Sequence, residues 1–549
     1  MESKPISAIF DSRWSRRQFL QRAGLGGAAM MSAGSLAAFL EACAGSTSAG
    51  TATGNVKASW TNVVIPENLD PHIGFDTDTL QFTQNVYESL LEYTPGGLDV
   101  RPLLAESMPT VSSDGLTYTF KIRQGIVFHD GAKLDSQAVL MSFQRLQEIN
   151  QGPASYLINI KGFSAPDPNT FVVNLSAPYS LFPGTMPWFL IASPNAISSN
   201  KTSSDPWAKN WFANKSAGTG PYMLDSVKPN DRIDMSQNKH YWRDFKPGVP
   251  TSVAIIQNAN TTTQLELLQS GQTDFLSNIG PDNAATAKTL PNVAVVRQPA
   301  IQLRTIPLNM IRTPLNDIRV RQALIAAFDY DGYTNFYKGF GRPANSPIPP
   351  QFPGWDSSLP FAKQDLNAAK QLLQQAGVAP GTKMRMVTVQ GLNYESFAGT
   401  IFQSALQKIG IDLAVEAPPW PQIPPQMAND ASSPPMTFLN VFPNTPDPAL
   451  VLRVSYHSAN VPSKGGYNWA NYKDPTLDSD LDKVVQLQDE SQRNQLLADM
   501  QKRIVDSAST IFCIAPDLVM PVRKEWAHVK YDPFFQDGII RWFYWSKGS

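Results

Sequence analysis

The chain has 549 residues, of which 42% are hydrophobic and 17% are charged. A chain of this length is too long for one hydrophobic core, and its composition excludes an intrinsically disordered protein. The formal net charge of −1 leaves no overall field that would attract nucleic acid, so we expect no nucleic-acid partner. The two cysteines, Cys43 and Cys513, cannot build a disulfide framework.

Residues 1–42 have the composition of an export segment. Residues 15–20 read Ser-Arg-Arg-Gln-Phe-Leu, which resembles the twin-arginine export motif. The weakly apolar run that follows, from Ala23 to Leu40, has the length and the small residues of a signal peptide. We therefore predict a twin-arginine signal peptide over residues 1–42.

A lipid anchor is the expected end of this segment. Residues 40–43 read Leu-Glu-Ala-Cys and resemble a bacterial lipobox, in which Cys43 is lipidated and becomes the mature N-terminus. Glu41 stands where that motif has a small residue, so cleavage after Ala44 and an uncleaved anchor are the alternatives. Residues 43–56, rich in Gly, Ala, Ser and Thr, are expected to form a flexible tether.

Three strands and two helices are predicted in the first part of the body. Apolar residues that alternate along the chain indicate strands, and apolar residues that recur every three or four positions indicate helices. These rules predict strands at Lys57–Ile65, Thr117–Ile122 and Thr170–Leu175, and helices at Gln81–Tyr93 and Leu134–Leu146.

The second part contains a strand–helix–strand unit. An apolar strand over 384–389 precedes a helical stripe over 397–409 and a second strand over 411–415. Such a unit favours a parallel sheet with helices on its faces, which makes the fold class α/β. Further helices are expected over 365–376 and, as a pair, over 476–507.

Two proline-rich stretches, residues 343–360 and 418–435, interrupt this order. Proline has no N–H group to donate to a sheet. We therefore expect both stretches to be extended surface loops.

Short motifs occur in a fixed order along the body. They are Asn-Val-Tyr-Glu-Ser-Leu-Leu-Glu-Tyr at 85–93, Arg-Pro-Leu-Leu-Ala-Glu-Ser at 101–107, Gly-Thr-Gly-Pro-Tyr at 218–222, Asn-Lys-His-Tyr-Trp at 238–242 and Pro-Leu-Asn-Asp-Ile-Arg-Val-Arg-Gln-Ala-Leu at 314–324. Together they resemble the signature of the extracellular solute-binding proteins of ABC importers, family 5, the peptide, nickel and opine class also called cluster C. The resemblance extends over essentially the whole mature chain.

The resemblance implies a two-lobe clamp with the type II periplasmic-binding-protein, or venus-flytrap, fold. One lobe is discontinuous, because it is built from the first part of the chain and the C-terminal tail, and it carries an extra subdomain. In this chain we place lobe I at 57–303 plus 518–549, with the subdomain inserted at about 100–215, and lobe II at 304–517.

The hinge is expected where two extended apolar runs, 301–309 and 510–522, are interrupted by proline. Arg304 is charged within the first of these runs, so we interpret it as a candidate ligand-binding residue. Its guanidinium could receive a ligand carboxylate or phosphate through two parallel hydrogen bonds. A salt bridge across the hinge is the alternative.

Asn444 stands where peptide-binding members of the family have an aspartate that pairs with the α-ammonium group of the ligand. A neutral amide offsets the desolvation of a buried ammonium less well than a carboxylate does. Asp447 lies nearby and is a second candidate, although its position before Pro448 is also typical of a helix cap.

Aromatic side chains are expected to complete the cleft. Trp420 matches a family tryptophan that lines the pocket, and Phe442 lies in the same cleft-facing stretch. Their rings could stack on sugars, apolar side chains or Arg-like groups. Asp76 and Thr77, after the first strand, are candidates from the opposite lobe.

The sequence favours a binding protein over an enzyme. The five histidines are scattered, and neither a nucleophile-elbow motif nor a phosphate-binding loop motif occurs. We therefore expect no catalytic residue, no metal site and no cofactor, and an exported hydrolase remains the alternative class.

The expected function is delivery of a small organic solute, a peptide or peptide-like compound, to an ABC permease with its ATPase. Opines, glycosides and metal chelates are the alternative solutes. We expect a monomer in the periplasm or at the outer face of the cell membrane, held there by the N-terminal lipid.

Overall fold

The computed structural model describes residues 56–157, 159–277, 279–350, 352–487, 489–534 and 538–548. The predicted signal peptide, Cys43 and the tether up to residue 55 lie outside the described residues. The described residues belong to one compact unit that begins at Thr53. No helix within these ranges is both long and apolar enough to cross a membrane.

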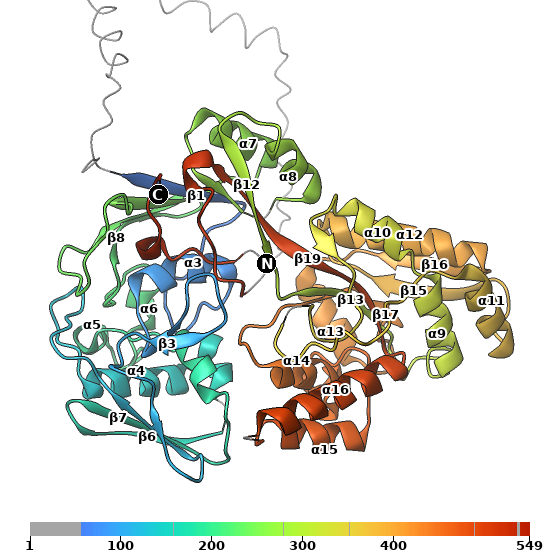
Figure 1. Ribbon diagram of the computed structural model, residues 1–549, viewed down its shortest axis with the longest axis horizontal. Coiled ribbons are helices and arrows are strands. Elements are labelled where there is room, and N and C mark those ends of the chain that lie inside the picture. Colours follow the sequence, from blue (N-terminus) through green and yellow to red (C-terminus); the bar gives the residue numbers. More distant parts are fainter. Residues whose placement is uncertain are drawn as a thin grey trace, which may run out of the picture. The chain divides into compact units, whose positions relative to one another are not determined.

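The largest sheet has ten strands and is organised around β19 (Thr510–Arg523). This 14-residue strand pairs antiparallel with β13 along its first half and with β12 along its second half (Figure 1). The other members are β1 (Lys57–Asn62), β8 (Tyr222–Lys228), β9 (Arg232–Gln237), β10 (Ser252–Gln257), β11 (Phe275–Leu276), β12 (Val293–Pro299), β13 (Leu303–Pro307), β14 (Gly341–Arg342) and β18 (Leu439–Val441).

Three smaller sheets accompany it. The strand–helix–strand unit forms as predicted, because β15 and β16 pair in parallel and the intervening helix packs on β16. An antiparallel four-stranded sheet, in the order β4-β5-β7-β6, lies within the span of the predicted subdomain. The strands are β2 (Leu91–Tyr93) with β3 (Val100–Pro102); β4 (Thr110–Val111), β5 (Thr117–Lys121), β6 (Ile160–Asp167) and β7 (Thr170–Leu175); and β15 (Thr382–Val387), β16 (Ile411–Glu416) and β17 (Met436–Thr437).

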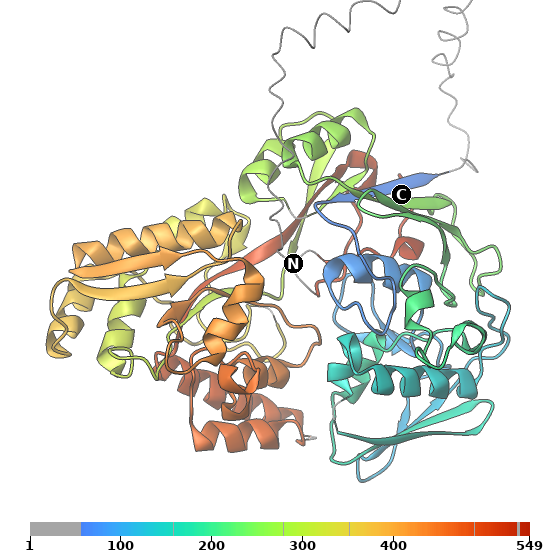
Figure 2. The same ribbon diagram turned by 180° about the vertical axis from the view of Figure 1, so that it is seen from behind.

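Most of the helices begin at an Asp, Asn or Ser whose side chain accepts a backbone N–H of the first turn. Helices α9 and α11 pack against each other, and α12 covers β16 (Figure 2). The helices are α3 (Thr77–Val86), α4 (Ser136–Ile149), α5 (Pro194–Asn200), α6 (Lys209–Phe212), α7 (Thr261–Ser270), α8 (Pro281–Ala287), α9 (Ile318–Ala327), α10 (Tyr330–Phe336), α11 (Leu366–Gln375), α12 (Asn393–Lys408), α13 (Ile423–Ala428), α14 (Pro448–Tyr456), α15 (Pro475–Val484) and α16 (Glu490–Asp506).

The helix predicted over 81–93 is shorter and starts earlier than expected. α3 ends at Val86, Tyr87 is extended, and the chain enters β2 at Leu91. The carbonyl of Val86 lies against the turn at 218–222, where a Cβ atom on Gly218 would stand only 2.0 Å from that oxygen. This close approach requires glycine at position 218. It also fixes the path of the chain at Val86, where the helix ends.

The prediction of extended surface loops was wrong for part of each proline-rich stretch. Residues 344–350 are buried, and the side chain of Asn345 ties this stretch together: its amide donates to Leu359 O at 2.7 Å and accepts from Trp355 Nε1 at 2.9 Å. Residues 423–428 form helix α13, since proline is tolerated in the first turn of a helix.

Three of the sequence motifs meet at one buried carboxylate. Glu88 accepts hydrogen bonds from Thr219 Oγ1 at 2.9 Å, Tyr241 Oη at 2.8 Å and Trp242 Nε1 at 3.0 Å. Burial raises the pKa of Glu88 to about 7, although Arg243 and the three donors oppose this rise. The motifs at 85–93, 218–222 and 238–242 therefore hold one another in place.

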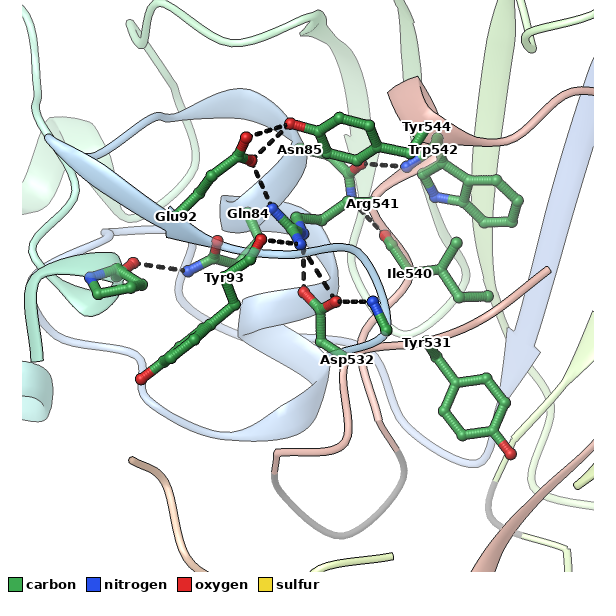
Figure 3. Close-up of polar contacts among 12 residues, drawn as sticks. Gln84, Asn85, Glu92, Tyr93, Tyr531, Asp532, Ile540, Arg541, Trp542 and Tyr544 are labelled. Atoms are coloured by element: carbon green, nitrogen blue, oxygen red, sulfur yellow. Dashed lines mark hydrogen bonds and ion pairs between the residues drawn. The ribbon is translucent and has the colours of Figure 1, made fainter. Parts of the chain in front are cut away.

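The C-terminal tail is tied to α3 and β2 by a buried polar network (Figure 3). Arg541 donates to Glu92 Oε2 at 2.5 Å and to Asp532 Oδ2 at 2.7 Å. Asn85 Nδ2 donates to the carbonyl of Ile540 at 2.8 Å. Segments from the two ends of the sequence thus share one part of the fold.

Candidate functional site

The segment that follows β18, residues 442–447, contacts elements from the first part of the chain. Trp188 Nε1 donates to the carbonyl of Asn444 at 2.5 Å. Tyr179 Oη donates to Asp447 Oδ2 at 2.9 Å. This segment of the predicted lobe II therefore lies directly against residues of the predicted lobe I.

Asp447 also caps helix α14, because its Oδ1 accepts the N–H of Ala449 at 2.8 Å. The carboxylate is buried, and this burial raises its pKa. The helix-cap interpretation of Asp447 is thus correct, and the second oxygen of the same carboxylate forms the contact with Tyr179.

The side chain of Asn444 lies beside Tyr156. Burial raises the pKa of Tyr156 to about 12, and a hydrogen bond with the Asn444 side chain opposes that rise. Oδ1 of Asn444 is buried and has no hydrogen-bond partner among the described residues.

An aromatic cluster built from the first part of the chain and the C-terminal tail faces this segment. It consists of Phe75, Tyr93, Tyr156, Trp188 and Phe534, whose neighbouring ring centroids lie between 4.2 and 5.6 Å apart. Sequence reasoning missed these rings, because they are separated in the chain by up to several hundred residues.

Asp76 and Thr77, the candidates from this side, directly follow Phe75. Asp76 caps α3 by accepting the N–H and the hydroxyl of Thr79, each at 2.9 Å, and Thr77 is buried. In this arrangement the ring of Phe75 reaches the cluster, while the carboxylate of Asp76 is engaged by its own helix.

Trp420 and Phe442 are both partly exposed, at 41% and 38%. Trp420 lies in a short 3-10 turn and stacks on the buried Trp469, with centroids 5.9 Å apart and ring planes 20° apart. Tyr467 also stacks on Trp469, at 6.0 Å and 12°. The aromatic pair 467 and 469, which follows two glycines, was the sequence signal that could have identified this stack.

Arg304 is the second residue of β13 and is 5% exposed. Its guanidinium carbon stands 4.6 Å from the ring centroid of Tyr394, in cation–π geometry. Nε and Nη1 have no hydrogen-bond acceptor, and no ion pair to Arg304 is present, among the described residues. The structure therefore gives no support to a salt bridge across the hinge.

Glu395 and Asn440 complete the surroundings of Arg304. Asn440 is the partner of Arg304 across the β13–β18 ladder, and its Nδ2 donates to Glu395 Oε1 and to Tyr394 Oη, each at 3.1 Å. Oδ1 of Asn440 is buried without a partner within the described ranges. Burial raises the pKa of Glu395 to about 7, against hydrogen bonds from Val389 and Asn440 and the charge of Arg304.

The structure brings part of the predicted site together. Arg304 lies beside the strand that leads into 442–447, and Val441 of that strand packs against the apolar cluster that contains Trp469. The arrangement offers unpaired N–H donors, unpaired carbonyl acceptors and exposed rings. Groups of three or more His, Cys, Asp or Glu that could hold a metal ion are not found in the described part of the chain.

The family model described as bacterial extracellular solute-binding proteins, family 5 Middle, matches residues 99–463. Protein XP55 of Streptomyces lividans is 27% identical over 514 residues, covering 90% of this chain and 91% of that protein. The probable D,D-dipeptide-binding periplasmic protein DdpA of Escherichia coli is 26% identical over 477 residues, covering 86% and 90%.

Solved structures share the fold. DppA of Helicobacter pylori, in complex with the peptide STSA, superposes with a TM-score of 0.76 at 23% identity and covers 90% of this chain and 98% of that one. The predicted two-lobe type II fold is therefore confirmed.

Proteins of the matched family act outside the cytoplasm, bind small solutes and work with the permeases of ABC transporters; they are binding proteins rather than enzymes. The match covers more than half of the sequence and agrees with the motifs that meet at Glu88. This chain belongs to the bacterial extracellular solute-binding proteins, family 5.

Proposed function

We propose that this protein captures a peptide or peptide-like solute between lobe I (57–303 plus 518–549) and lobe II (304–517) and hands it to an ABC permease. The printed names of DdpA and of the Helicobacter pylori DppA complex, which concern a D,D-dipeptide and the peptide STSA, support a peptidic solute.

The observation that carries this proposal is the set of buried polar atoms without partners. Arg304 offers two unpaired N–H donors, and Asn440 and Asn444 each offer an unpaired carbonyl oxygen. A buried guanidinium whose N–H donors are unpaired and that forms no direct ion pair is costly, and an unpaired buried acceptor also costs free energy. A solute that supplies a carboxylate and N–H groups removes these costs, and a peptide carries both.

Asn444 shapes the preference within this class. Since its amide is neutral, we infer that a free α-ammonium group contributes less to binding than it does in relatives with an aspartate there. The exposed rings of Trp420 and Phe442 favour a solute with a flat apolar or sugar face. A glycosidic or opine-like solute is the second candidate on that ground, and Asp447, Asp76 and Thr77 stay predicted contacts.

A calorimetric titration with matched peptides tests this proposal. The panel contains each peptide with a free and with an acetylated amino terminus, and with a free and with an amidated carboxyl terminus. Arg304→Gln should weaken the binding of free-carboxyl peptides by at least about tenfold and leave amidated peptides unaffected, because each charge-assisted hydrogen bond contributes about 1.5–3 kcal/mol.

Asn444→Asp is the second variant, and it should strengthen the binding of free-amino peptides relative to acetylated ones. Phe361→Ala, at an exposed ring that we do not assign to the solute site, is the control. Failure of the wild-type protein to bind any peptide, or tight wild-type binding that depends on the free amino group, would contradict the proposal.

We further propose that the protein leaves the cytoplasm through the twin-arginine route and remains a monomer, anchored by a lipid on Cys43 with residues 43–56 as its tether. The order of the motifs at 15–20 and 40–43 supports this. The mass of the mature N-terminal peptide tests it, since an unmodified Cys43 in that peptide would rule out the anchor.

A further inference from the structure

A second polar pocket lies on the other side of β2 from the aromatic cluster. Tyr93 contributes to that cluster, whereas the preceding residue, Glu92, faces the pocket, because successive side chains of a strand point to opposite faces. The pocket has a volume of about 470 Å³. Its principal side chains are Glu92, Arg101, Arg123, Trp242, Arg243, Asp244, Lys246 and Tyr544.

The charge of this pocket is positive. Four cationic side chains, Arg101, Arg123, Arg243 and Lys246, line it together with two carboxylates. One of these, Glu92, is already engaged by Arg541 at 2.5 Å, by Arg101 at 2.9 Å and by the hydroxyl of Tyr544. The pocket therefore has more cationic side chains than carboxylates that could neutralise them.

Aromatic rings hold the guanidinium groups in position. Arg123 lies 5.5 Å and Arg243 5.0 Å from the ring centroid of Trp242. Arg243 also lies 5.4 Å and Arg101 5.2 Å from the centroid of Tyr544. Cation–π contacts of this kind stabilise the guanidinium groups at the pocket, and Arg243 is further held by hydrogen bonds to the hydroxyls of Tyr241 and Tyr544.

Two of the cationic side chains, Arg123 and Lys246, are available to pair with the charge of a ligand. Arg123 donates Nε to the carbonyl of Leu103 at 2.8 Å, and Lys246 is exposed. Neither of them forms an ion pair with any residue that the structure describes. A planar guanidinium and an exposed ammonium that line the same pocket are a combination that suits the oxygens of a phosphate group.

The pocket is also close to the point where the chain enters the body. The carbonyl of Val56 accepts the N–H of Thr251 at 2.7 Å. Lys246 is five residues from Thr251 and so lies within about 18 Å of that point. A body held at a membrane by the segment that precedes Val56 would keep this pocket within reach of lipid headgroups.

We propose that this pocket binds a phosphate ester, of which the headgroup phosphate of an anionic phospholipid and a soluble phosphate ester are the two sources. The site is independent of the solute site at Arg304. It adds a phosphate contact to lobe I, which contains the entry point of the chain.

Titration calorimetry with glycerol 3-phosphate and with inorganic phosphate tests the site, using the natively exported protein. We expect binding that weakens as the salt concentration rises. The double variant Arg123→Gln/Lys246→Gln should bind at least about tenfold more weakly, because it removes charge-assisted hydrogen bonds. Lys201→Gln/Lys228→Gln, at two exposed lysines outside the pocket, is the charge-matched control and should bind as the wild type does.

Vesicles of phosphatidylcholine with and without phosphatidylglycerol distinguish the two sources. Tighter binding to phosphatidylglycerol vesicles that disappears in the Arg123/Lys246 variant assigns the site to a lipid headgroup. Binding of glycerol 3-phosphate without that vesicle difference assigns it to a soluble ester.

The proposal is wrong if neither the phosphate probes nor the vesicles bind in a way that the pocket variant weakens. The peptide panel is run on the same variant, because unchanged peptide binding separates this site from the solute site.

Discussion

Glu395 and Glu88 are both buried, and burial raises the pKa of each to about 7. Neither carboxylate has an ion-pair partner within 4 Å among the described residues; each is held by hydrogen-bond donors instead. Since an unfolded glutamate has a pKa near 4.5, the folded state binds more protons than the unfolded state between about pH 4.5 and 7.

The pH dependence of stability follows from this difference. A raised carboxyl pKa destabilises the folded state as pH rises, with no penalty below about pH 4.5 and the full penalty above about pH 7. The variant Glu395→Gln removes the part of this penalty that Glu395 contributes. Relative to the wild type, this variant should gain stability between pH 4.5 and 8, by up to about 3 kcal/mol.

The midpoint of urea unfolding, measured across that pH range, checks this prediction. Glu266→Gln, at an exposed position, controls for the change in net charge. If the difference between Glu395→Gln and the wild type does not change with pH, the raised pKa of Glu395 is refuted.

At this scale the sequence identified some residues and missed others for a clear reason. Arg304 could be singled out because a charge within an apolar strand is unusual. Its neighbours Asn440, Tyr394 and Glu395 could not, because they come from elements about 90 to 136 residues away and carry no local pattern. The cap of α14 by Asp447 was foreseeable, since an Asp–Pro pair at a helix start is a local signal.

Among the elements, local periodicity predicted those strands and helices that pack on segments adjacent to them in the sequence. The unit β15–α12–β16 has the strand, helix and strand in the expected order. The course of 343–360 was not predictable, because long-range contacts such as the hydrogen bond from Asn345 Nδ2 to the carbonyl of Leu359 leave no local pattern in the sequence. Apolar spacing over 81–93 suggested one helix, although Leu90 is buried by a strand connection instead.

Strand β19 carries an ion-pair arrangement at its centre. The side chain of Asp517 is fully buried and pairs with Arg297 of β12 and with Arg342 of β14. These two strands lie in the parts of the chain that we assign to lobe I and lobe II. Asp517 therefore joins both parts at the proposed hinge.

Asp517→Asn should destabilise the protein by about 2 kcal/mol, because it leaves two arginines without their anion. The cost is lower than for a fully buried pair, since half of the Arg297 side chain is exposed. Urea unfolding measures it. Asp482→Asn, which removes an exposed partner of Arg453, is the matched control and should cost less than about 1 kcal/mol. Equal effects of the two variants would argue against a structural role for the Asp517 pairs.

For the whole molecule, the order of the motifs was more informative than any single element. Motifs at 85–93, 218–222 and 238–242 are far apart in the chain and meet at Glu88, so their joint presence specifies the fold. The solute could not be predicted in the same way, because the contacts that we propose for it involve side chains such as Asn440, whose neighbours Arg304, Tyr394 and Glu395 are brought to it only by the fold. The lobe boundaries stay a prediction.

The two proposed sites bind different ligands and lie in different parts of the molecule. The proposed solute site has its unpaired polar atoms in the predicted lobe II, at Arg304, Asn440 and Asn444, and segment 442–447 contacts Trp188 and Tyr179 of the predicted lobe I. We therefore expect its occupation to be coupled to the relative position of the lobes. The phosphate pocket is formed within the predicted lobe I alone, so we expect its occupation to be independent of the solute.

Small-angle X-ray scattering, with and without the tightest-binding peptide of the panel, tests most directly whether two lobes close over a solute. The radius of gyration should fall when the peptide binds, and mass spectrometry should recover the peptide with its mass unchanged. Identical scattering curves with and without bound peptide, or a peptide recovered with an altered mass, would contradict a solute-binding receptor of this kind.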